Sequence, residues 1–258
     1  MNPNPTAITI IPAFYDGKLS KPKTEPFLEV AEFFCNTIQG EGAEMGTPCA
    51  FLRLQWCTQN CVWCDTSEVW RFGNPYTFDE LFQLMEHHNV IDLFKAGQQL
   101  VITGGSPIRQ QDALILFLEL FDYTYGFTPV IQIENECTRM PKDELIKFVQ
   151  TWNNSPKLAS SGNAKKIRYQ PEVLKKLSSL QNSWFKFVVN CQEDWEEIQM
   201  DFLDPGLIEK NQIILMPMGA TREELEKNRP IALEMAVMHN VRYSTREHIE
   251  IWNKKTGV

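Results

Sequence analysis

The stretch Cys57-Thr58-Gln59-Asn60-Cys61-Val62-Trp63-Cys64-Asp65-Thr66 decides how the rest of the chain is interpreted. It places three thiols in the spacing C-x3-C-x2-C, in a loop that follows the apolar run 50–54. A short loop lets three such thiolates converge on one cubane iron–sulfur cluster. Electron-transfer ferredoxins close all four irons with cysteine, whereas three thiolates leave one iron open to another ligand. The stretch therefore predicts a 4Fe–4S cluster with one open coordination position.

Two other kinds of cysteine site fit the stretch less well. A zinc site generally needs four nitrogen or sulfur ligands, often as paired C-x2-C, and His87 and His88 are distant in sequence from Cys64. A disulfide framework is disfavoured by the chain length and by the odd total of seven cysteines. The four cysteines outside the loop are scattered singly, which is typical of free thiols in a reducing compartment.

Composition sets the broad class. The 258 residues, 43% of them hydrophobic, suit one large globular domain with a substantial core. The formal net charge of −8 argues against a general nucleic-acid-binding surface. No apolar run approaches the roughly 18 residues of a membrane span, and the N-terminus lacks the pattern of a secretory signal. We therefore expect a cytoplasmic protein that binds neither nucleic acid nor membrane.

The order of apolar patterns predicts the domain organisation. Residues 1–26 contain five prolines and indicate an irregular N-terminal arm, with a short strand at 8–11. Residues 27–258 form a single domain, in which six strands are predicted at 29–37, 50–54, 99–103, 129–133, 184–190 and 212–216. The predicted helices are 77–96, 108–125, 141–152, 171–180, 192–202 and 221–239. Capping boxes, Thr77 with Glu80 and Thr221 with Glu224, support two helix starts.

Strands that alternate with helices imply parallel βαβ units. About six such units are fewer than the eight of a closed TIM barrel, so we expect an α/β fold. In such sheets function gathers at the carboxyl ends of the strands. The cysteine loop, the Gly104-Gly105 turn and Glu134 all follow or end predicted strands, and we expect them to share one face.

The cysteine spacing, with an aromatic residue before the last thiol, resembles the radical S-adenosylmethionine (SAM) superfamily. Further stretches resemble one family within it, 7-carboxy-7-deazaguanine synthase. These stretches are 34–42, Gly46, 51–53, 64–66, 103–105, 155–157, 186–189 and 248–258. The resemblance implies a partial, shortened TIM-like barrel of the β6/α3 type and a homodimer.

The resemblance also implies an activity. Members of the family are carbon–nitrogen lyases that contract 6-carboxy-5,6,7,8-tetrahydropterin to 7-carboxy-7-deazaguanine with loss of ammonia. This step belongs to the biosynthesis of queuosine-type 7-deazapurines. The implied cofactors are a 4Fe–4S cluster, SAM and Mg²⁺. A reductase or flavodoxin-like protein supplies one electron, SAM is cleaved, and the resulting radical takes the hydrogen at C6 of the pterin.

Roles carry over to matching residues of this chain. Cys57, Cys61 and Cys64 match the cluster ligands, and Thr66 matches a threonine that ligates Mg²⁺. A hard cation with few protein ligands is ordinary magnesium behaviour. Arg53 matches a ligand of the substrate carboxylate, for which a planar fork is suited. The remaining implied substrate contacts are Ile38, Gln39, Gly40, Glu41, Thr103, His248 and Val258, the last through its terminal carboxylate.

A second set of residues matches positions that bind SAM. Glycine at one of them permits close approach of backbone to ligand. The set is Trp63, Asp65, Gly105, Ser106, Glu134, Ser155, Pro156, Lys157, Met216, Pro217, Met218 and Gly219.

The chain departs from its relatives at two places. Ser106 stands where the superfamily usually has the glutamate of Gly-Gly-Glu-Pro, and a neutral hydroxyl is a weaker acceptor than a carboxylate. The sequence at 134–138, Glu-Asn-Glu-Cys-Thr, replaces the usual Glu-Thr-Asn-Gly-Thr. We expect Glu134 to compensate for Ser106.

Two other functions remain open on the residues alone. Another small radical SAM enzyme, such as a glycyl-radical activase, would share the cluster but act on a protein. An iron–sulfur or SAM-binding regulator without turnover would share the cysteines, with Ser106 as the lesion. Substrate-dependent cleavage of SAM separates both from the main hypothesis.

Overall fold

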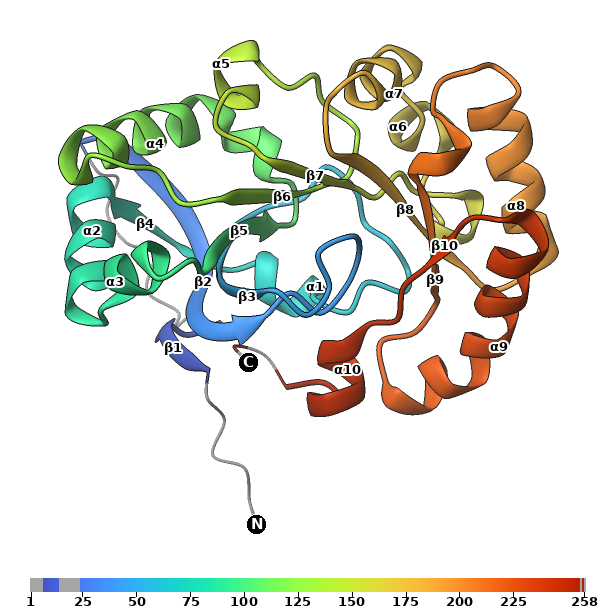
Figure 1. Cartoon of the computed structure of the whole chain (residues 1–258), viewed down its shortest axis with the longest axis horizontal. Coiled ribbons are helices and arrows are strands. Elements are labelled where there is room, and N and C mark those ends of the chain that lie inside the picture. Colours follow the sequence, from blue (N-terminus) through green and yellow to red (C-terminus); the bar gives the residue numbers. More distant parts are fainter. Residues whose placement is uncertain (1–6, 14–23, 256, 258) are drawn as a thin grey trace.

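The computed structural model describes residues 7–13, 24–255 and 257. Within these ranges ten strands form one sheet in the order β1-β2-β3-β5-β6-β7-β8-β9-β10, and β4 pairs with β2. The strands are β1 (Ile8–Ile11), β2 (Phe27–Ile38), β3 (Pro48–Leu54), β4 (Asn74–Thr77), β5 (Gln99–Gly104), β6 (Ile131–Asn135), β7 (Thr151–Asn154), β8 (Ser183–Val189), β9 (Ile213–Pro217) and β10 (Arg242–Tyr243). Figure 1 shows the sheet curving from β1 to β10 with most of the helices along its outer side.

The helices follow the strands in the alternation that the sequence predicts. They are α1 (Ser67–Trp70), α2 (Phe78–His87), α3 (Val90–Lys95), α4 (Gln111–Tyr125), α5 (Asp143–Ile146), α6 (Lys165–Arg168), α7 (Pro171–Ser178), α8 (Gln192–Ile198), α9 (Arg222–His239) and α10 (Glu247–Trp252). None of the helices in the described ranges combines the length and apolar character needed to cross a membrane.

The parallel part of the sheet positions the site. Strands β3, β5, β6, β7, β8 and β9 run parallel to one another, and the short β10 extends them. Arg53 on β3 is in register with Thr103 on β5, so both side-chain positions lie near the carboxyl ends of their strands. Six parallel strands in an open sheet order confirm the predicted partial barrel.

A large apolar core fills the space between sheet and helices, and a small second cluster contains Val188, Ile214 and Met216. Aromatic rings dominate the large core near α2 and α4, where the Phe82 centroid lies 5.3 Å from that of Phe117 and 5.8 Å from that of Phe121. Farther along the sheet, in the same core, Phe187 of β8 packs edge-on against Phe202 at 5.0 Å. Such pairs add about 0.5–1.5 kcal/mol beyond the apolar area that they bury.

Helix starts follow the predicted chemistry. Thr77 accepts from the Glu80 amide, and the Glu80 carboxylate accepts from the Thr77 amide, so the capping box is confirmed. At α9 only half of the predicted box forms. Thr221 accepts from the Glu224 amide, but the Glu224 carboxylate accepts instead from the amide of Ala220.

Two predicted helices are corrected. The helix predicted at 77–96 is two helices, because Asn89 adopts a left-handed φ of 57° between α2 and α3. The helix predicted at 141–152 ends at Ile146 in α5, and its last two residues, Thr151 and Trp152, begin strand β7. All four residues of β7 are buried, and two of them are asparagines. The sequence pattern extends the predicted helix into β7 because Thr151 and Trp152 resemble the end of an amphipathic helix.

Hydrogen bonds across the sheet explain how a polar strand can be buried. Asn154 of β7 accepts from the Asn135 amide group of β6 at 3.1 Å and donates to Ser183 of β8 at 2.8 Å. Asn153 donates to Gln132 of β6 at 3.0 Å. Buried polar groups that are paired in this way avoid the cost of lost hydration.

Candidate active site

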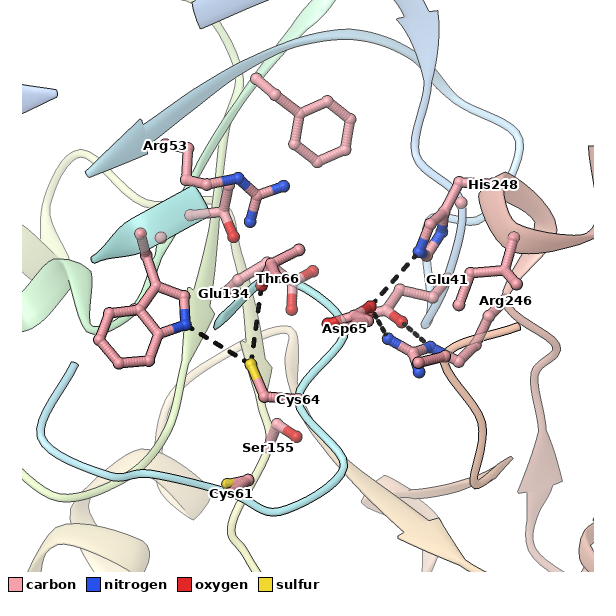
Figure 2. A pocket seen from close by; sticks show the side chains of 18 of the residues that line it. Glu41, Arg53, Cys61, Cys64, Asp65, Thr66, Glu134, Ser155, Arg246 and His248 are labelled. Atoms are coloured by element: carbon pink, nitrogen blue, oxygen red, sulfur yellow. Dashed lines mark hydrogen bonds and ion pairs between the residues drawn. The ribbon is translucent and has the colours of Figure 1, made fainter. Parts of the chain in front are cut away.

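One cavity opens at the carboxyl ends of β3, β5, β6 and β7 (Figure 2). Most of the residues assigned from sequence line it: Ile38, Gln39, Gly40, Glu41, Arg53, Cys57, Cys61, Trp63, Cys64, Asp65, Thr66, Thr103, Gly105, Glu134, Ser155, Lys157, Met216 and His248. Others among the assigned residues are absent from the lining: Ser106, Pro156, Pro217, Met218 and Gly219. Val258 lies outside the described residues.

The cysteine loop is packed against the glycine turn after β5. A Cβ atom on Gly105 would lie 2.2 Å from the Trp56 carbonyl oxygen and 2.6 Å from the Cys57 Cβ atom. Gly104 has a φ of 145° and passes equally close to Leu54. Only glycine permits this approach, and it brings backbone of the Gly104-Gly105 turn to the edge of the thiol site.

Each thiol receives an N–H group. The indole of Trp70 donates to Cys64 Sγ at 3.5 Å, the Asn163 side-chain amide donates to Cys61 Sγ at 3.3 Å, and the Gln59 backbone amide donates to Cys57 Sγ at 3.4 Å. Hydrogen bonds to sulfur stabilise thiolate charge and tune a cluster's reduction potential. Burial raises the pKa of Cys57 to about 12, so this thiol is neutral unless a metal replaces its proton.

The three thiols can serve as ligands to three irons of one cluster. Within the described ranges no group of three or more His, Cys, Asp or Glu residues is arranged to hold one metal ion. In a cubane cluster the ligands bind different irons, so their sulfur atoms need not meet at one point. The donor set, three cysteines in a cavity with N–H groups behind them, fits a 4Fe–4S cluster.

A network of charges ties the cysteine loop to the C-terminal segment. Arg246 is buried and donates to Asp65 and Glu41, and its Nη1 atom lies 2.6 Å from the Gly219 carbonyl. Burial alone would raise the pKa of Asp65, but Arg246 and His248 outweigh it and lower that pKa well below its ordinary value. The Asp65 carboxylate is therefore ionised across the working pH range.

The C-terminal segment also forms hydrogen bonds with the turn at 38–42. The Glu247 amide donates to the Gly40 carbonyl at 2.7 Å, and the Gly42 amide donates to Ser244 at 2.9 Å. A Cβ atom on Gly40 would lie 2.4 Å from Nδ1 of His248. Glycine at position 40 thus lets the C-terminal segment close against the turn.

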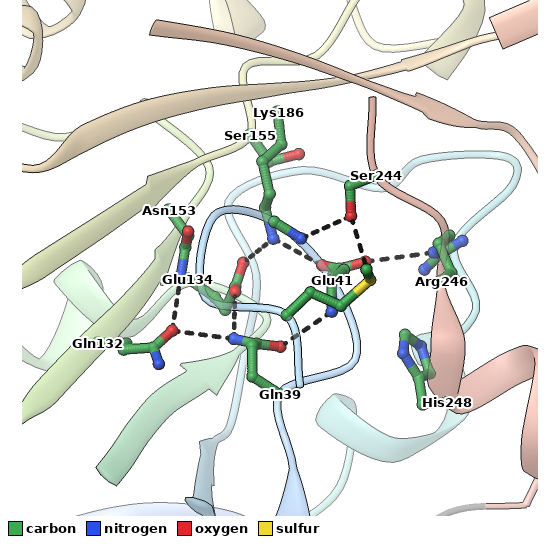
Figure 3. A network of polar contacts seen from close by, with 12 residues as sticks. Gln39, Glu41, Gln132, Glu134, Asn153, Ser155, Lys186, Ser244, Arg246 and His248 are labelled. Carbon is green, nitrogen blue, oxygen red and sulfur yellow. Dashed lines mark hydrogen bonds and ion pairs between the residues drawn. The ribbon is translucent and has the colours of Figure 1, made fainter. Parts of the chain in front are cut away.

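A second network lies deeper in the cavity (Figure 3). The Lys186 ammonium is fully buried and lies 2.7 Å from Glu41 and 2.6 Å from Glu134. Gln39 donates to Glu134 at 3.1 Å and to Gln132 at 3.2 Å. Burial would raise the pKa of Glu41, but Lys186, Arg246 and His248 lower it to about 2. Burial and the nearby Glu41 raise the pKa of Glu134, against the opposing effect of Lys186.

Arg53 and Thr66 face the cavity near the thiols. The Nε atom of Arg53 lies 2.6 Å from the buried Glu32, which fixes the guanidinium plane. Thr66 occupies the N-cap position of α1, yet its hydroxyl makes no capping bond there and lies 3.9 Å from Cys64 Sγ. The Thr66 side chain therefore does not act as a helix cap.

Ser106 forms a hydrogen bond with a buried carboxylate. Its hydroxyl is fully buried and donates to Glu136 at 2.5 Å. The Glu134 carboxylate, predicted to compensate for Ser106, is instead engaged by Lys186 and Gln39.

Sequence reasoning missed four charged residues of the site. Glu32, Glu136 and Arg246 line the cavity, and Lys186 bridges two carboxylates beneath it. Arg246 and Glu32 carry no local pattern, because their partners lie far away in the chain. Glu136 could have been identified from the sequence, because the 134–138 segment contains an additional carboxylate and position 106 lacks the usual one.

Comparison with known proteins identifies sequence relatives and a solved structure with the same fold. No family model matches the chain. A 7-carboxy-7-deazaguanine synthase of Pyrobaculum aerophilum is 30% identical over 234 residues, which cover 90% of this chain and 98% of the relative. The enzyme of the same name from Halobacterium salinarum is 27% identical over 260 residues, covering 92% and 95%. The crystal structure of QueE from Escherichia coli superposes with a TM-score of 0.61 at 22% identity, covering 86% of this chain and 95% of that one, and shows the shared fold.

Proposed function

The chain belongs to the 7-carboxy-7-deazaguanine synthase family of radical SAM lyases, and from this premise we propose how its cavity performs the reaction. The reaction is the ring contraction of 6-carboxy-5,6,7,8-tetrahydropterin to 7-carboxy-7-deazaguanine with release of ammonia. One observation carries the proposal: a single cavity holds three thiols beside an arginine and a set of amide and carboxylate groups. The thiols suit the cofactor, and the polar groups suit a pterin that bears a carboxylate.

Cys57, Cys61 and Cys64 would hold a 4Fe–4S cluster, whose open iron takes SAM. When bound, the cluster and SAM together supply one-electron chemistry that yields a carbon-centred radical. Ser155, Lys157 and Met216 line the cavity and are the proposed contacts to SAM beyond the iron. Thr66, with its hydroxyl free of a capping bond, is the proposed protein ligand of Mg²⁺.

The substrate groups follow from complementarity. Glu32 occupies the Nε atom of Arg53, so the two terminal nitrogens are left to pair with the substrate carboxylate in a fork. Gln39, Glu41 and Glu134 offer amide and carboxylate oxygens to the N–H groups of the pterin edge. Because Lys186 and Arg246 neutralise the carboxylates, the cavity can be acidic at its base without repelling an anionic substrate.

We further propose that the protein is a homodimer that receives its electron from a reductase or flavodoxin-like donor in the cytoplasm. Exposed apolar side chains on α9 support a protein contact: Ile231, Leu233, Val237 and Met238. Size-exclusion chromatography with light scattering tests the dimer. A mass equal to one chain across micromolar concentrations would refute it.

Anaerobic turnover tests the function. The protein is reconstituted with iron and sulfide, then given SAM, a reductant, Mg²⁺ and the carboxytetrahydropterin. We expect 7-carboxy-7-deazaguanine, detected by mass spectrometry, and cleavage of SAM that depends on the pterin. Pterin-independent cleavage without product would favour a protein-directed radical enzyme, and an intact cluster with no cleavage would favour a regulator.

A further inference from the structure

One carboxylate of the cavity differs from all the others. Glu136 follows β6, is 4% exposed and lines the cavity. Its Oε1 atom accepts from three hydroxyl groups, those of Ser106 at 2.5 Å, Thr138 at 2.6 Å and Thr58 at 3.0 Å. Its Oε2 atom is buried and has no hydrogen-bond partner in the part of the chain that the structure describes.

The other cavity carboxylates are already paired with cations. Glu32 pairs with Arg53, Glu41 and Glu134 with Lys186, and Asp65 with Arg246. In the same described ranges Glu136 forms no ion pair. A buried carboxylate oxygen without a partner is unfavourable, because its lost hydration is not replaced by a hydrogen bond. An unpartnered oxygen on a residue that lines a cavity points to a ligand carrying positive charge or N–H groups.

The position of Glu136 limits what that ligand can be. Thr58, which donates to it, is adjacent to Cys57 in the loop, and Ser106 follows the Gly104-Gly105 turn that touches Cys57. The Glu136 carboxylate therefore lies at the thiol end of the cavity. An amino acid ligand held by a cluster on these thiols would bring its amino group to this end.

We propose that Glu136 accepts the hydrogen bond from the amino group of SAM. Ser106, at the position where a carboxylate is missing, donates to Glu136 and orients it. In this chain the carboxylate comes from the turn after β6, whereas the superfamily pattern places it in the turn after β5. Ser106, in the turn after β5, donates a hydrogen bond to that carboxylate. This assignment rests on the proposed binding of SAM at the cluster.

Binding of SAM to the reconstituted, cluster-loaded protein tests the assignment without turnover. The dissociation constant is measured anaerobically by calorimetry, and the electron paramagnetic resonance spectrum of the reduced cluster is recorded with and without SAM. Glu136→Gln keeps the shape of the side chain but removes its charge. We expect it to raise the dissociation constant by roughly 10- to 100-fold, as loss of a charge-assisted hydrogen bond does.

Two controls separate recognition from a general effect. Glu134→Gln removes the same charge from the same strand region, and we expect little change in SAM affinity because Lys186 and Gln39 hold that side chain. An analogue of SAM without the amino group should bind weakly to both the wild type and Glu136→Gln, with no added loss in the variant. A purely structural role of Glu136 would weaken both ligands alike.

The outcomes distinguish this assignment from the proposed function. Wild-type affinity in Glu136→Gln, or an equal loss in Glu134→Gln, overturns the role of Glu136 while leaving the function intact. A wild-type protein that carries the cluster but binds no SAM refutes both. If Glu136→Gln does not assemble the cluster, the double variant Ser106→Glu/Glu136→Gln decides: restored affinity supports the assignment, and weak affinity with an intact cluster overturns it.

Discussion

Lys186 is the residue on which the interior of the cavity depends. Its ammonium is fully buried and is shared by Glu41 and Glu134. Lys186→Met keeps most of the apolar stem but removes the charge. The variant leaves Glu41 with Arg246 as its remaining partner and Glu134 without any cation in the described part of the chain.

The size of the effect follows from the burial. Removing one partner of a buried ion pair costs about 3–5 kcal/mol, because the other charge is left uncompensated. For a domain of this size 1 kcal/mol corresponds to about 2–4 °C in melting temperature. We therefore expect Lys186→Met to lower the melting temperature by about 6–20 °C at pH 7.

The loss should depend on pH. Burial already raises the pKa of Glu134, and Lys186 opposes that rise. Without Lys186 the folded-state pKa rises further above the unfolded value, so the folded variant binds a proton that the unfolded chain lacks. Stability from such a group is complete below the unfolded pKa and is lost as pH rises through the folded pKa. The deficit relative to wild type should therefore be smaller at pH 5 than at pH 8.

Thermal unfolding followed by circular dichroism measures both effects. Lys176→Met is the matched control, because Lys176 forms a surface ion pair with Asp143 at 3.0 Å and such pairs contribute about 1 kcal/mol or less. A Lys186→Met deficit no larger than that of the control would refute the reasoning. So would a large deficit that is equal at pH 5 and pH 8.

Three further predictions concern ligands of the cavity. Arg53→Ala should raise the KM for the pterin by about 10-fold or more, through loss of a charge-assisted fork, while the visible spectrum of the cluster stays intact; loss of the cluster would mean that the role given to Arg53 is wrong. Trp70→Phe removes the N–H group that Cys64 accepts and should lower the cluster reduction potential in a redox titration, whereas an unchanged potential would exclude that hydrogen bond. Thr66→Ala should raise the Mg²⁺ concentration needed for half-maximal turnover, and an unchanged requirement would show that the ion binds elsewhere.

The sequence predicts most of the fold because its apolar strands are strongly patterned. Strands such as β3 and β5 are short apolar runs that end in loops with glycine or cysteine, so their ends are recognisable. Strand β7 is different, since Asn153 and Asn154 are stable in the sheet only through partners on β6 and β8. Such partners come from tertiary structure and leave no periodic signal in the strand itself.

Some residues of the candidate site are likewise recognisable from the sequence, and others are defined only by tertiary contacts. The thiols and Gly105 are recognisable from their spacing, because local geometry requires those residue types close together. Arg246 and Lys186 are not, since each is defined by carboxylates that are more than fifty residues away in the chain. The pairing of Ser106 with Glu136 also appears only when β5 and β6 are placed side by side.

The fate of the hydrogen at C6 of the substrate shows whether the pterin reacts with the radical formed from SAM. Carboxytetrahydropterin deuterated at C6 is turned over anaerobically, and SAM and its cleavage product are analysed by mass spectrometry. If the pterin lies beside the cluster-bound SAM, deuterium appears in the adenosyl group while 7-carboxy-7-deazaguanine accumulates. SAM cleavage that yields only unlabelled nucleoside, with no deazaguanine, would contradict the account.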